Sequence, residues 1–371
     1  MILISESFSE RVIELACQIQ QIPAPTFHEQ QRAQFMRERF DALGLLDVHI
    51  DDAGNALARL PGASGSERPL VVSAHLDTVH PQGTLLSLER AHDRLIGPSI
   101  GDNSLGLATL LSLPIWLRQH SVTLPGDLWL AANVGEEGLG DLAGMQAVVD
   151  HFGARPLGYL VLEGMGYGGI LHQGLSVERY KIEVETPGGH SWSKYGEPSA
   201  IHILCALVTH LAGLALPKNP CTTLNVGVIQ GGTSVNTIAS HAWMELDLRS
   251  EDGVRLSQLV NEVHRQVNAI QQPKAHITMT RIGKRPAGAL PSNHPLVQLA
   301  CQTLEDLNIQ PHLDIASTDA NQPLSRGYPA ICVGITYGNN AHAADEYILT
   351  APITHGVSQV LNIVTRAWTT L

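Results

Sequence analysis

The chain has 371 residues, of which 44% are hydrophobic and only 16% are charged, so its length predicts two or three domains and its composition argues against disorder. Its formal net charge is −12. A charge of this sign argues against a nucleic-acid or anionic-membrane partner that binds over a broad basic face.

The chain begins with MILISESFSERV, whose apolar stretch is too short for a secretion signal and has no basic flanking residues. No segment reaches the ~18 consecutive apolar residues that a membrane span needs. The five cysteines are scattered without a CxxC pair, which is typical of a reduced compartment and disfavours a thiolate zinc site. We therefore expect a soluble, cytoplasmic protein.

Helices are predicted at the start of the chain. Apolar residues recur from Phe8 to Ile19 at the spacing of one helix face. The segment from Thr26 to Glu29 matches a capping box, which predicts a second helix that ends near Leu43.

Strand-like apolar runs follow. They are LVVSAH (70–75), DLWLAAN (127–133) and YLVLE (159–163), and a helix is expected between the first two, from Leu105 to Gln119. The first and last runs are nearly all apolar, which is typical of central strands covered by helices on both faces. Alternation of strands with helices predicts an α/β domain.

The pattern changes after residue 174. Apolar and polar residues alternate in VERYKIEVET, TLNVGVI, AWMELDLR and HITMTRI, and helical patterns cover 198–214 and 254–270. The resulting order β-α-β-β-α-β is the split βαβ, ferredoxin-like pattern. A helix at 295–308 and the strand AICVGI then resume the α/β pattern. We therefore predict a domain of residues 175–287 inserted into one formed by 1–174 and 288–371.

The 18 histidines direct attention to metal ligands, and two candidates follow predicted strands. His75 and Asp77 come at the end of LVVSAH, at the sheet edge where α/β proteins place their ligands. A carboxylate beside a histidine can hold the ring in one tautomer, as it does for zinc ligands. The alternative is an ordinary histidine and aspartate in a loop.

More carboxylates occupy similar positions. Glu136 and Glu137 directly follow an apolar strand, where two uncompensated adjacent carboxylates would cost several kcal/mol. A divalent cation would remove that cost, with one glutamate as ligand and the other free to act as a base. A solvated loop is the alternative. Asp102, in IGDNSLG, is a further candidate, for which helix capping is the alternative.

Two more residues complete the candidate set. Glu163 ends YLVLE, and His342 lies in NNAHAADEY after a predicted strand. Together the histidines and carboxylates offer nitrogen and oxygen ligands suited to two zinc-like ions. The segment Gly164 to Gly169 satisfies GxGxxG, but strand-like residues follow it where a dinucleotide site needs a helix.

The motifs HLDTVHP, GDN, NVGEEG, LEG, PGGHSW, GGTSVNTI and NAHAADEY, in this order, resemble the M20 family of metallopeptidases. That family includes tripeptide aminopeptidases, glutamate carboxypeptidases, succinyl-diaminopimelate desuccinylases and acetylornithine deacetylases. The resemblance covers essentially the whole chain. It implies a di-metal aminopeptidase-like α/β catalytic domain, with a mixed sheet flanked by helices, and an inserted ferredoxin-like α+β domain that acts as lid and dimerisation domain.

The resemblance also implies roles for individual residues. The metal ligands it implies are His75, Asp102, Glu137, Glu163 and His342. Asp102 would bridge two divalent ions, expected to be zinc, with manganese or cobalt as alternatives. Glu136 would be the general base, and Asp77 would orient His75.

In the inserted domain, His190 of PGGHSW resembles the family histidine that reaches a partner subunit's active site to hold the substrate carbonyl. Asn236 and Arg249 resemble lid residues that contact the substrate carbonyl and carboxylate. The alternatives are a simple turn residue for His190 and a strand-edge charge for Arg249. A homodimer formed through the lid domain is therefore expected.

The function that follows is metal-dependent hydrolysis of an amide bond in small peptides. The first alternative is an N-acyl-amino-acid deacylase or desuccinylase that uses the same site. The second is a catalytically silent relative that binds peptide or metal, or only dimerises. Such relatives typically lose the base or a ligand, whereas Glu136 and every ligand position are occupied here.

Overall fold

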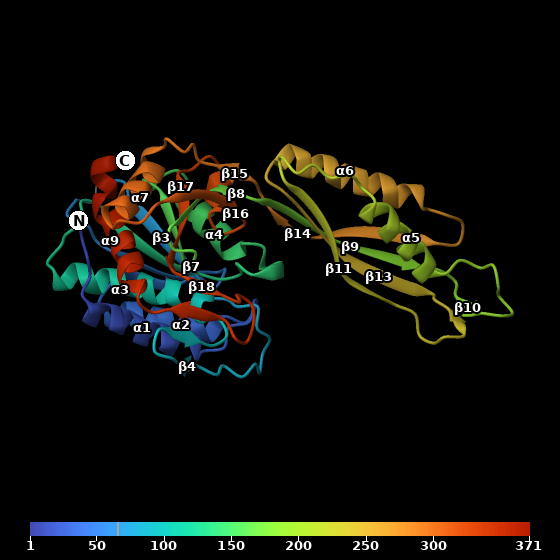
Figure 1. Cartoon of the computed structure of the whole chain (residues 1–371), viewed down its shortest axis with the longest axis horizontal. Coiled ribbons are helices and arrows are strands. Elements are labelled where there is room, and N and C mark those ends of the chain that lie inside the picture. The colour runs from blue at the N-terminus through green and yellow to red at the C-terminus, as the bar shows by residue number, and fades with distance from the viewer. Residues whose placement is uncertain (65–66) are drawn as a thin grey trace. The chain divides into compact units, whose positions relative to one another are not determined.

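The computed structural model describes residues 1–64 and 67–371. The described residues divide into two compact units. Unit 1 comprises Met1–Gly174 and Gly288–Leu371, and unit 2 comprises Leu175–Ala287. Figure 1 labels the helices and strands of both.

Nine strands of the described part of unit 1 form one mixed sheet. They are β1 (Leu46–Ile50), β2 (Ala56–Leu60), β3 (Leu70–His75), β6 (Leu128–Asn133), β7 (Tyr159–Met165), β8 (Gly169–Gly174), β15 (Gly288–Ala289), β16 (His312–Ala316) and β17 (Ala330–Thr336). The hydrogen-bonded order is β1-β2-β6-β3-β7-β17-β8-β15, and β16 pairs with β8. Strands β6, β3, β7 and β17 run parallel, so their carboxyl ends meet at one edge.

The parallel centre of this sheet is buried on both faces. Every residue of β3 and of β17 is buried, which explains why LVVSAH and AICVGIT are apolar almost throughout. Because a continuous apolar run of this length suits only a doubly covered strand, the sequence identifies these central strands correctly. The predicted α/β class is confirmed.

Helices flank the sheet of unit 1. They are α1 (Glu6–Gln20), α2 (Gln30–Ala42), α3 (Gly106–Gln119), α4 (Ala143–Phe152), α7 (Pro295–Asp306), α8 (Asn321–Ser325) and α9 (Ile353–Thr370). Helix α3 packs on β3 and β7, α1 packs on α3, and α9 packs on α7 and β17. Helix α9 was not predicted from the sequence. In the part of the chain that the structure describes, no helix is both long and apolar enough to cross a membrane.

The predicted capping box is wrong. Helix α2 begins at Gln30, and the side chain of Glu29 does not cap it. The Thr26 hydroxyl instead donates a hydrogen bond to Oδ2 of Asp77 at 2.9 Å. Oε1 of Glu29 accepts the backbone amides of Phe27 at 3.0 Å and of Gly135 at 3.2 Å. Contacts with Asp77 and Gly135, which are distant in the sequence, and with the neighbouring amide of Phe27 therefore replace the two capping contacts on which the motif rests.

A smaller sheet of unit 1 carries one loop of the candidate site. Its strands are β4 (Glu89–Arg90), β5 (Arg94–Ile96), β18 (Gly338–Asn339) and β19 (Tyr347–Leu349), in the order β18-β19-β5-β4. Strands β18 and β19 form an antiparallel hairpin. The hairpin loop, residues 340–346, contains His342.

Unit 2, whose residues are all described, contains a four-stranded antiparallel sheet and two helices. In chain order its main elements are β9 (Ser176–Glu185), α5 (Ala200–Ala212), β11 (Thr222–Gly231), β13 (His241–Ser250), α6 (Gly253–Ala269) and β14 (His276–Arg285). The strand order is β11-β13-β9-β14, and both helices cover one face of the sheet (Figure 1). The alternating residues Tyr180, Ile182 and Val184 are buried beneath them. A separate short ladder joins β10 (Gly189–His190) to β12 (Thr237–Ile238).

Candidate metal centre

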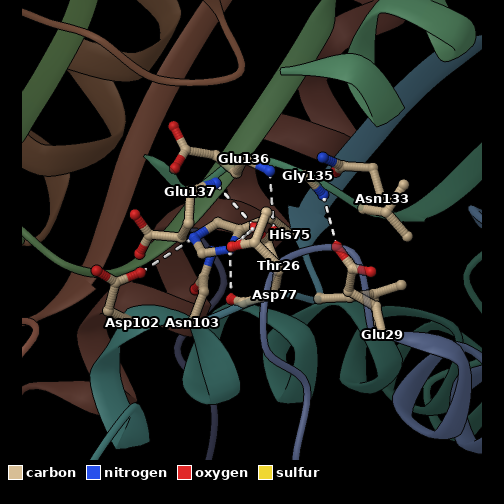
Figure 2. Close-up of polar contacts among 12 residues, drawn as sticks. Thr26, Glu29, His75, Asp77, Asp102, Asn103, Asn133, Gly135, Glu136 and Glu137 are labelled. Carbon is tan, nitrogen blue, oxygen red and sulfur yellow. Dashed lines mark hydrogen bonds and ion pairs between the residues drawn. The ribbon is translucent and has the colours of Figure 1, made fainter. Parts of the chain in front are cut away.

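The seven candidate residues predicted in unit 1 lie together at the carboxyl edge of the parallel strands. Figure 2 labels His75, Asp77, Asp102, Glu136 and Glu137 among them. His75 ends β3, Glu136 and Glu137 follow β6, and Glu163 lies in β7. Asp77 follows β3, Asp102 lies in a distorted helical turn, Ile100–Leu105, and His342 lies in the hairpin loop. Five segments that are distant in the sequence therefore contribute to one cluster.

Asp77 organises two of these segments. His75 and Asp77 are almost completely buried, and Nδ1 of His75 lies 3.0 Å from the backbone oxygen of Asp77 and 3.5 Å from its Oδ1. The same carboxylate accepts the backbone amides of Glu136 at 2.9 Å and of Glu137 at 2.8 Å. One aspartate thus contacts the imidazole and also holds the loop of the two glutamates. The contact with the loop was not predicted.

A first set of donors surrounds the other nitrogen of His75. Nε2 of His75 lies 3.1 Å from Oδ1 of Asp102 and 3.6 Å from Oε2 of Glu163. One ligand atom from each of the three residues lies within 4.8 Å of the others. Because Nδ1 faces Asp77, Nε2 is the nitrogen available to a metal ion.

A second set of donors shares Asp102. Nε2 of His342 lies 3.1 Å from Oδ2 of Asp102 and 3.2 Å from Oε1 of Glu137. The two oxygens of Asp102 therefore face different histidines, Oδ1 toward His75 and Oδ2 toward His342. A carboxylate with one oxygen in each donor set has the arrangement of a bridging ligand.

The cluster carries an excess of negative charge. Burial raises the pKa of Glu163 to about 7, although the neighbouring His75 opposes this rise. Hydrogen bonds to Asp102 and Glu137 raise the pKa of His342 to about 10. Burial also acts to raise the pKa of Asp102, but its hydrogen bonds with His342 and His75 hold that pKa below its usual range. The pKa shifts of His342 and Asp102 reflect contacts between imidazoles and carboxylates, whereas burial dominates the shift of Glu163.

The residues present fit two divalent cations. The two donor sets consist of carboxylate oxygens and imidazole nitrogens, the ligand types that zinc and related ions take. A third combination, His75 with Glu136 and Glu137, has ligand atoms within the same 4.8 Å limit. Glu136, which is only 6% exposed, therefore lies beside His75 of the first donor set and Glu137 of the second.

The alternative roles of Asp102, Glu136 and Glu137 are not the ones that the structure shows. The cap at the start of α3 comes from Asn103, whose Oδ1 accepts the amides of Gly106 at 3.1 Å and of Gly164 at 3.0 Å. Asp102 is thereby left facing the two histidines. Glu136 and Glu137 lie in a buried loop and not in a solvated one.

Sequence reasoning missed several residues that hold the cluster in place. Arg32 of α2 is fully buried, and its guanidinium donates to the backbone oxygens of Ile22 and Leu76. Burial lowers the pKa of Arg32 to about 10, whereas Asp77 opposes this fall. Glu346 accepts the backbone amides of Gly101 and Asp102. The only signal for Glu346 was its place in the motif NAHAADEY, because hydrogen bonds to distant backbone leave no periodic pattern.

The remaining predicted residues lie in unit 2. His190 and Asn236 are exposed neighbours, because Ser191 donates its amide to the backbone oxygen of Asn236 at 3.0 Å. Arg249 lies apart from them on β13, where Nε contacts Oδ2 of Asp247 at 2.7 Å. The structure therefore groups His190 with Asn236 and does not group Arg249 with either.

The chain is similar in sequence to a known peptidase family and to individual relatives. The model of peptidase family M20/M25/M40 matches residues 71–366. The uncharacterized protein YqjE of Bacillus subtilis is 24% identical over 253 residues, which cover 65% of this chain and 66% of YqjE. The chain thus spans just under two thirds of that relative. The succinyl-diaminopimelate desuccinylase of Corynebacterium glutamicum is 26% identical over 349 residues, 90% of each chain.

Solved structures with similar folds cover nearly the whole chain. Aminopeptidase PepT from Bacillus cereus matches with a TM-score of 0.79 at 20% identity, over 97% of this chain and 99% of that one. A tripeptidase from Staphylococcus aureus matches with a TM-score of 0.81 at 20% identity, over 97% of this chain and 98% of the tripeptidase chain. Because the sequences are only 20% identical, these structural similarities show a shared fold alone.

Proposed function

We propose that this chain, which belongs to peptidase family M20/M25/M40, is a hydrolase of amide bonds that cleaves small peptides with the help of two divalent ions. The observation that carries this proposal is the bridging position of Asp102, whose two oxygens lie 3.1 Å from Nε2 of His75 and from Nε2 of His342. Glu163 would complete the His75 set, and Glu137 would complete the His342 set. The proposed metal is zinc, with manganese or cobalt as alternatives.

The chain's own residues supply the proton transfers and the orientation. Glu136 would accept a proton from the attacking water and later deliver it to the leaving amine. Asp77 supports this role because it holds the Glu136 amide at 2.9 Å, which fixes the backbone that carries the base. Ions bound at this centre would polarise the scissile carbonyl and lower the pKa of a bound water towards ~7.

The names of three similar proteins suggest two kinds of substrate for the same site. The likeness to PepT and to the S. aureus tripeptidase supports a peptide substrate. The relative from C. glutamicum, named as a desuccinylase and matched over 90% of both chains, supports an N-acyl amino acid as the alternative. A silent relative is disfavoured because Glu136 and all five proposed ligands are present. A cytoplasmic location stays a prediction from the cysteine pattern.

Removal and return of metal tests the proposal. Treatment with a strong chelator should abolish hydrolysis, because the proposed reaction depends on the Lewis acidity of the bound ions. Reconstitution with zinc, manganese or cobalt should restore activity as two equivalents bind, measured on dipeptides, tripeptides and N-acyl amino acids. Cleavage of N-acyl amino acids alone would favour the deacylase alternative. Full activity in metal-depleted protein would reject the two-ion centre.

Unit 2 supports the proposal of a homodimer. Strand β11 lies at an edge of its sheet and exposes Val228 and Ile229, with 36% and 50% of their surfaces accessible. Helix α5 likewise exposes Ile201. Exposed apolar residues on an edge strand invite pairing with another chain, and a two-fold axis satisfies both edges at once.

His190 has the geometry of a hydrogen-bond donor to substrate. Nδ1 of His190 accepts the backbone amide of Trp192 at 3.2 Å, so the proton of the neutral ring resides on Nε2. We propose that this proton stabilises the substrate carbonyl in the active site of a partner subunit. Asn236, beside it, would contact the same carbonyl, and Arg249 would bind a substrate carboxylate in competition with Asp247.

Subunit mixing tests this arrangement. His190→Ala and Glu136→Gln proteins should each be nearly inactive, whereas a mixed dimer contains one site with both residues intact. Free exchange at equal concentrations should restore about a quarter of wild-type activity, because half of the dimers are mixed and each has one intact site of two. Hetero-dimers that form without recovering activity would show that His190 does not act in a partner's site.

A further inference from the structure

Glu346 is a buried carboxylate that joins two segments of the proposed metal centre. Its side chain is fully buried, and Oε1 accepts the backbone amides of Gly101 at 2.6 Å and of Asp102 at 2.9 Å. Its own backbone closes the hairpin loop, because its amide donates to the oxygen of Ala343 at 3.2 Å. The Glu346 backbone oxygen accepts the amide of Gly97 at 2.8 Å.

A glutamate at this position is costly for folding alone. Within residues 1–64 and 67–371 no ion pair to Glu346 is present, and its Oε2 is buried without a hydrogen-bond partner. A buried carboxylate without a cationic partner costs several kcal/mol in stability. A neutral side chain such as glutamine would still accept the amides of Gly101 and Asp102 and would avoid that cost, so a function of the site explains the glutamate better than stability does.

The two segments that Glu346 joins are those that must meet for Asp102 to bridge. Asp102 lies in the turn Ile100–Leu105 with φ −107° and ψ 88°, which are not helical values. His342 lies in the hairpin loop with φ 70°, in the left-handed region that non-glycine residues rarely adopt. Neither conformation is the local preference of its segment. Contacts from outside each segment must therefore hold the two side chains in place.

We propose that Glu346 is a positioning residue that holds the Asp102 turn and the His342 hairpin loop in the one arrangement in which Asp102 faces both histidines. The proposal rests on the proposed two-ion centre. Glu346 acts through Asp102 and is not itself placed among the donors, since its Oε1 is occupied by two amides. It also does not belong to any of the three donor groups found in the described chain. Partners that orient ligands in this way typically contribute about 10–100-fold to metal affinity.

Two conservative variants separate the reach of the side chain from its charge. Glu346→Gln keeps a carbonyl oxygen at the position of Oε1 and removes the charge. Glu346→Asp keeps the charge but withdraws the oxygens by one carbon–carbon bond, ~1.5 Å, beyond reach of both amides. If geometry is what Glu346 supplies, Gln should preserve the centre and Asp should damage it.

Metal binding without substrate provides the measurement. Zinc affinity is measured by competition with a chromophoric chelator, and the visible absorption of bound cobalt reports the ligand geometry. Glu346→Asp should bind zinc about 10–100-fold more weakly and change the cobalt spectrum. Glu346→Gln should stay within about 3-fold of the wild type and keep its spectrum, well below the loss expected when an orienting partner is removed.

Other outcomes would overturn the proposal. Wild-type zinc affinity in Glu346→Asp, or a Gln variant as weak as the Asp variant, would show that the two amide contacts do not position the ligands. Asn362→Leu serves as a matched control, because buried Asn362 bonds to the backbone of Ile2 and Ser358 away from the ligands. Its unfolding temperature should fall while its zinc affinity stays unchanged. Wild-type protein that binds no divalent ion would instead reject the proposed function.

Discussion

Replacing Glu136 with glutamine is expected to lower kcat at least ~100-fold while both metal equivalents stay bound. Glutamine has nearly the shape of glutamate but cannot accept a proton from the attacking water. The backbone of this loop should not move, because Asp77 holds the amide of residue 136 and not its side chain. Steady-state kinetics with the best peptide found, together with elemental analysis, measures both effects.

The neighbouring glutamate provides the control for this variant. Oε1 of Glu137 lies 3.2 Å from Nε2 of His342, so Glu137→Gln should lose metal as well as activity. The two variants differ by one position in the chain and carry the same chemical change. Near wild-type turnover in pure Glu136→Gln protein would show that another group is the base.

Replacing Asp102 with alanine should remove metal from both sites. Its two oxygens serve different donor sets, whereas His342 contributes to one set only. Asp102→Ala is therefore expected to retain well under one equivalent after dialysis, while His342→Ala should chiefly empty one site and retain about one. Inductively coupled plasma analysis of the dialysed proteins distinguishes these results. Two full equivalents in Asp102→Ala would contradict the bridging role.

Calorimetry should separate loss of metal from loss of structure in these variants. Asp102 packs beside Asn103, which caps α3 through the amide of Gly106. That cap does not involve the Asp102 side chain, so the metal-free Asp102→Ala protein should unfold at a temperature close to that of metal-free wild type. A large fall in this temperature would mean that the carboxylate is needed for folding.

The positions of the candidate ligands could be predicted from the sequence because they depend on strand ends. Apolar runs such as LVVSAH predict buried strands, and the first polar residues after them must lie at the sheet edge. His75 and Glu137 are brought together in this way. His342 also follows a predicted buried strand, AICVGI, but the structure places it in a hairpin of a separate small sheet, so its position does not depend on a strand end of the main sheet.

Contacts between segments that are distant in the sequence could not be predicted. The segment from Thr26 to Glu29 has the letters of a capping box, but Thr26 contacts Asp77 and Glu29 contacts Gly135. Likewise, the buried position of Arg32 follows from two carbonyl groups that the fold brings to it. Hydrogen bonds of this kind depend on tertiary geometry, for which local spacing carries no signal.

The buried guanidinium of Arg32 links the opening of the N-terminal helices to the centre. Because it joins the backbone at Ile22 to the backbone at Leu76, the segment beside Asp77 cannot keep its position if α2 separates from the sheet. Local opening of α2 and retention of cations are then mutually exclusive states of one equilibrium. Cations that bind only the closed state raise the free energy of this opening, and amide protons of α2 should exchange more slowly as the cation concentration rises.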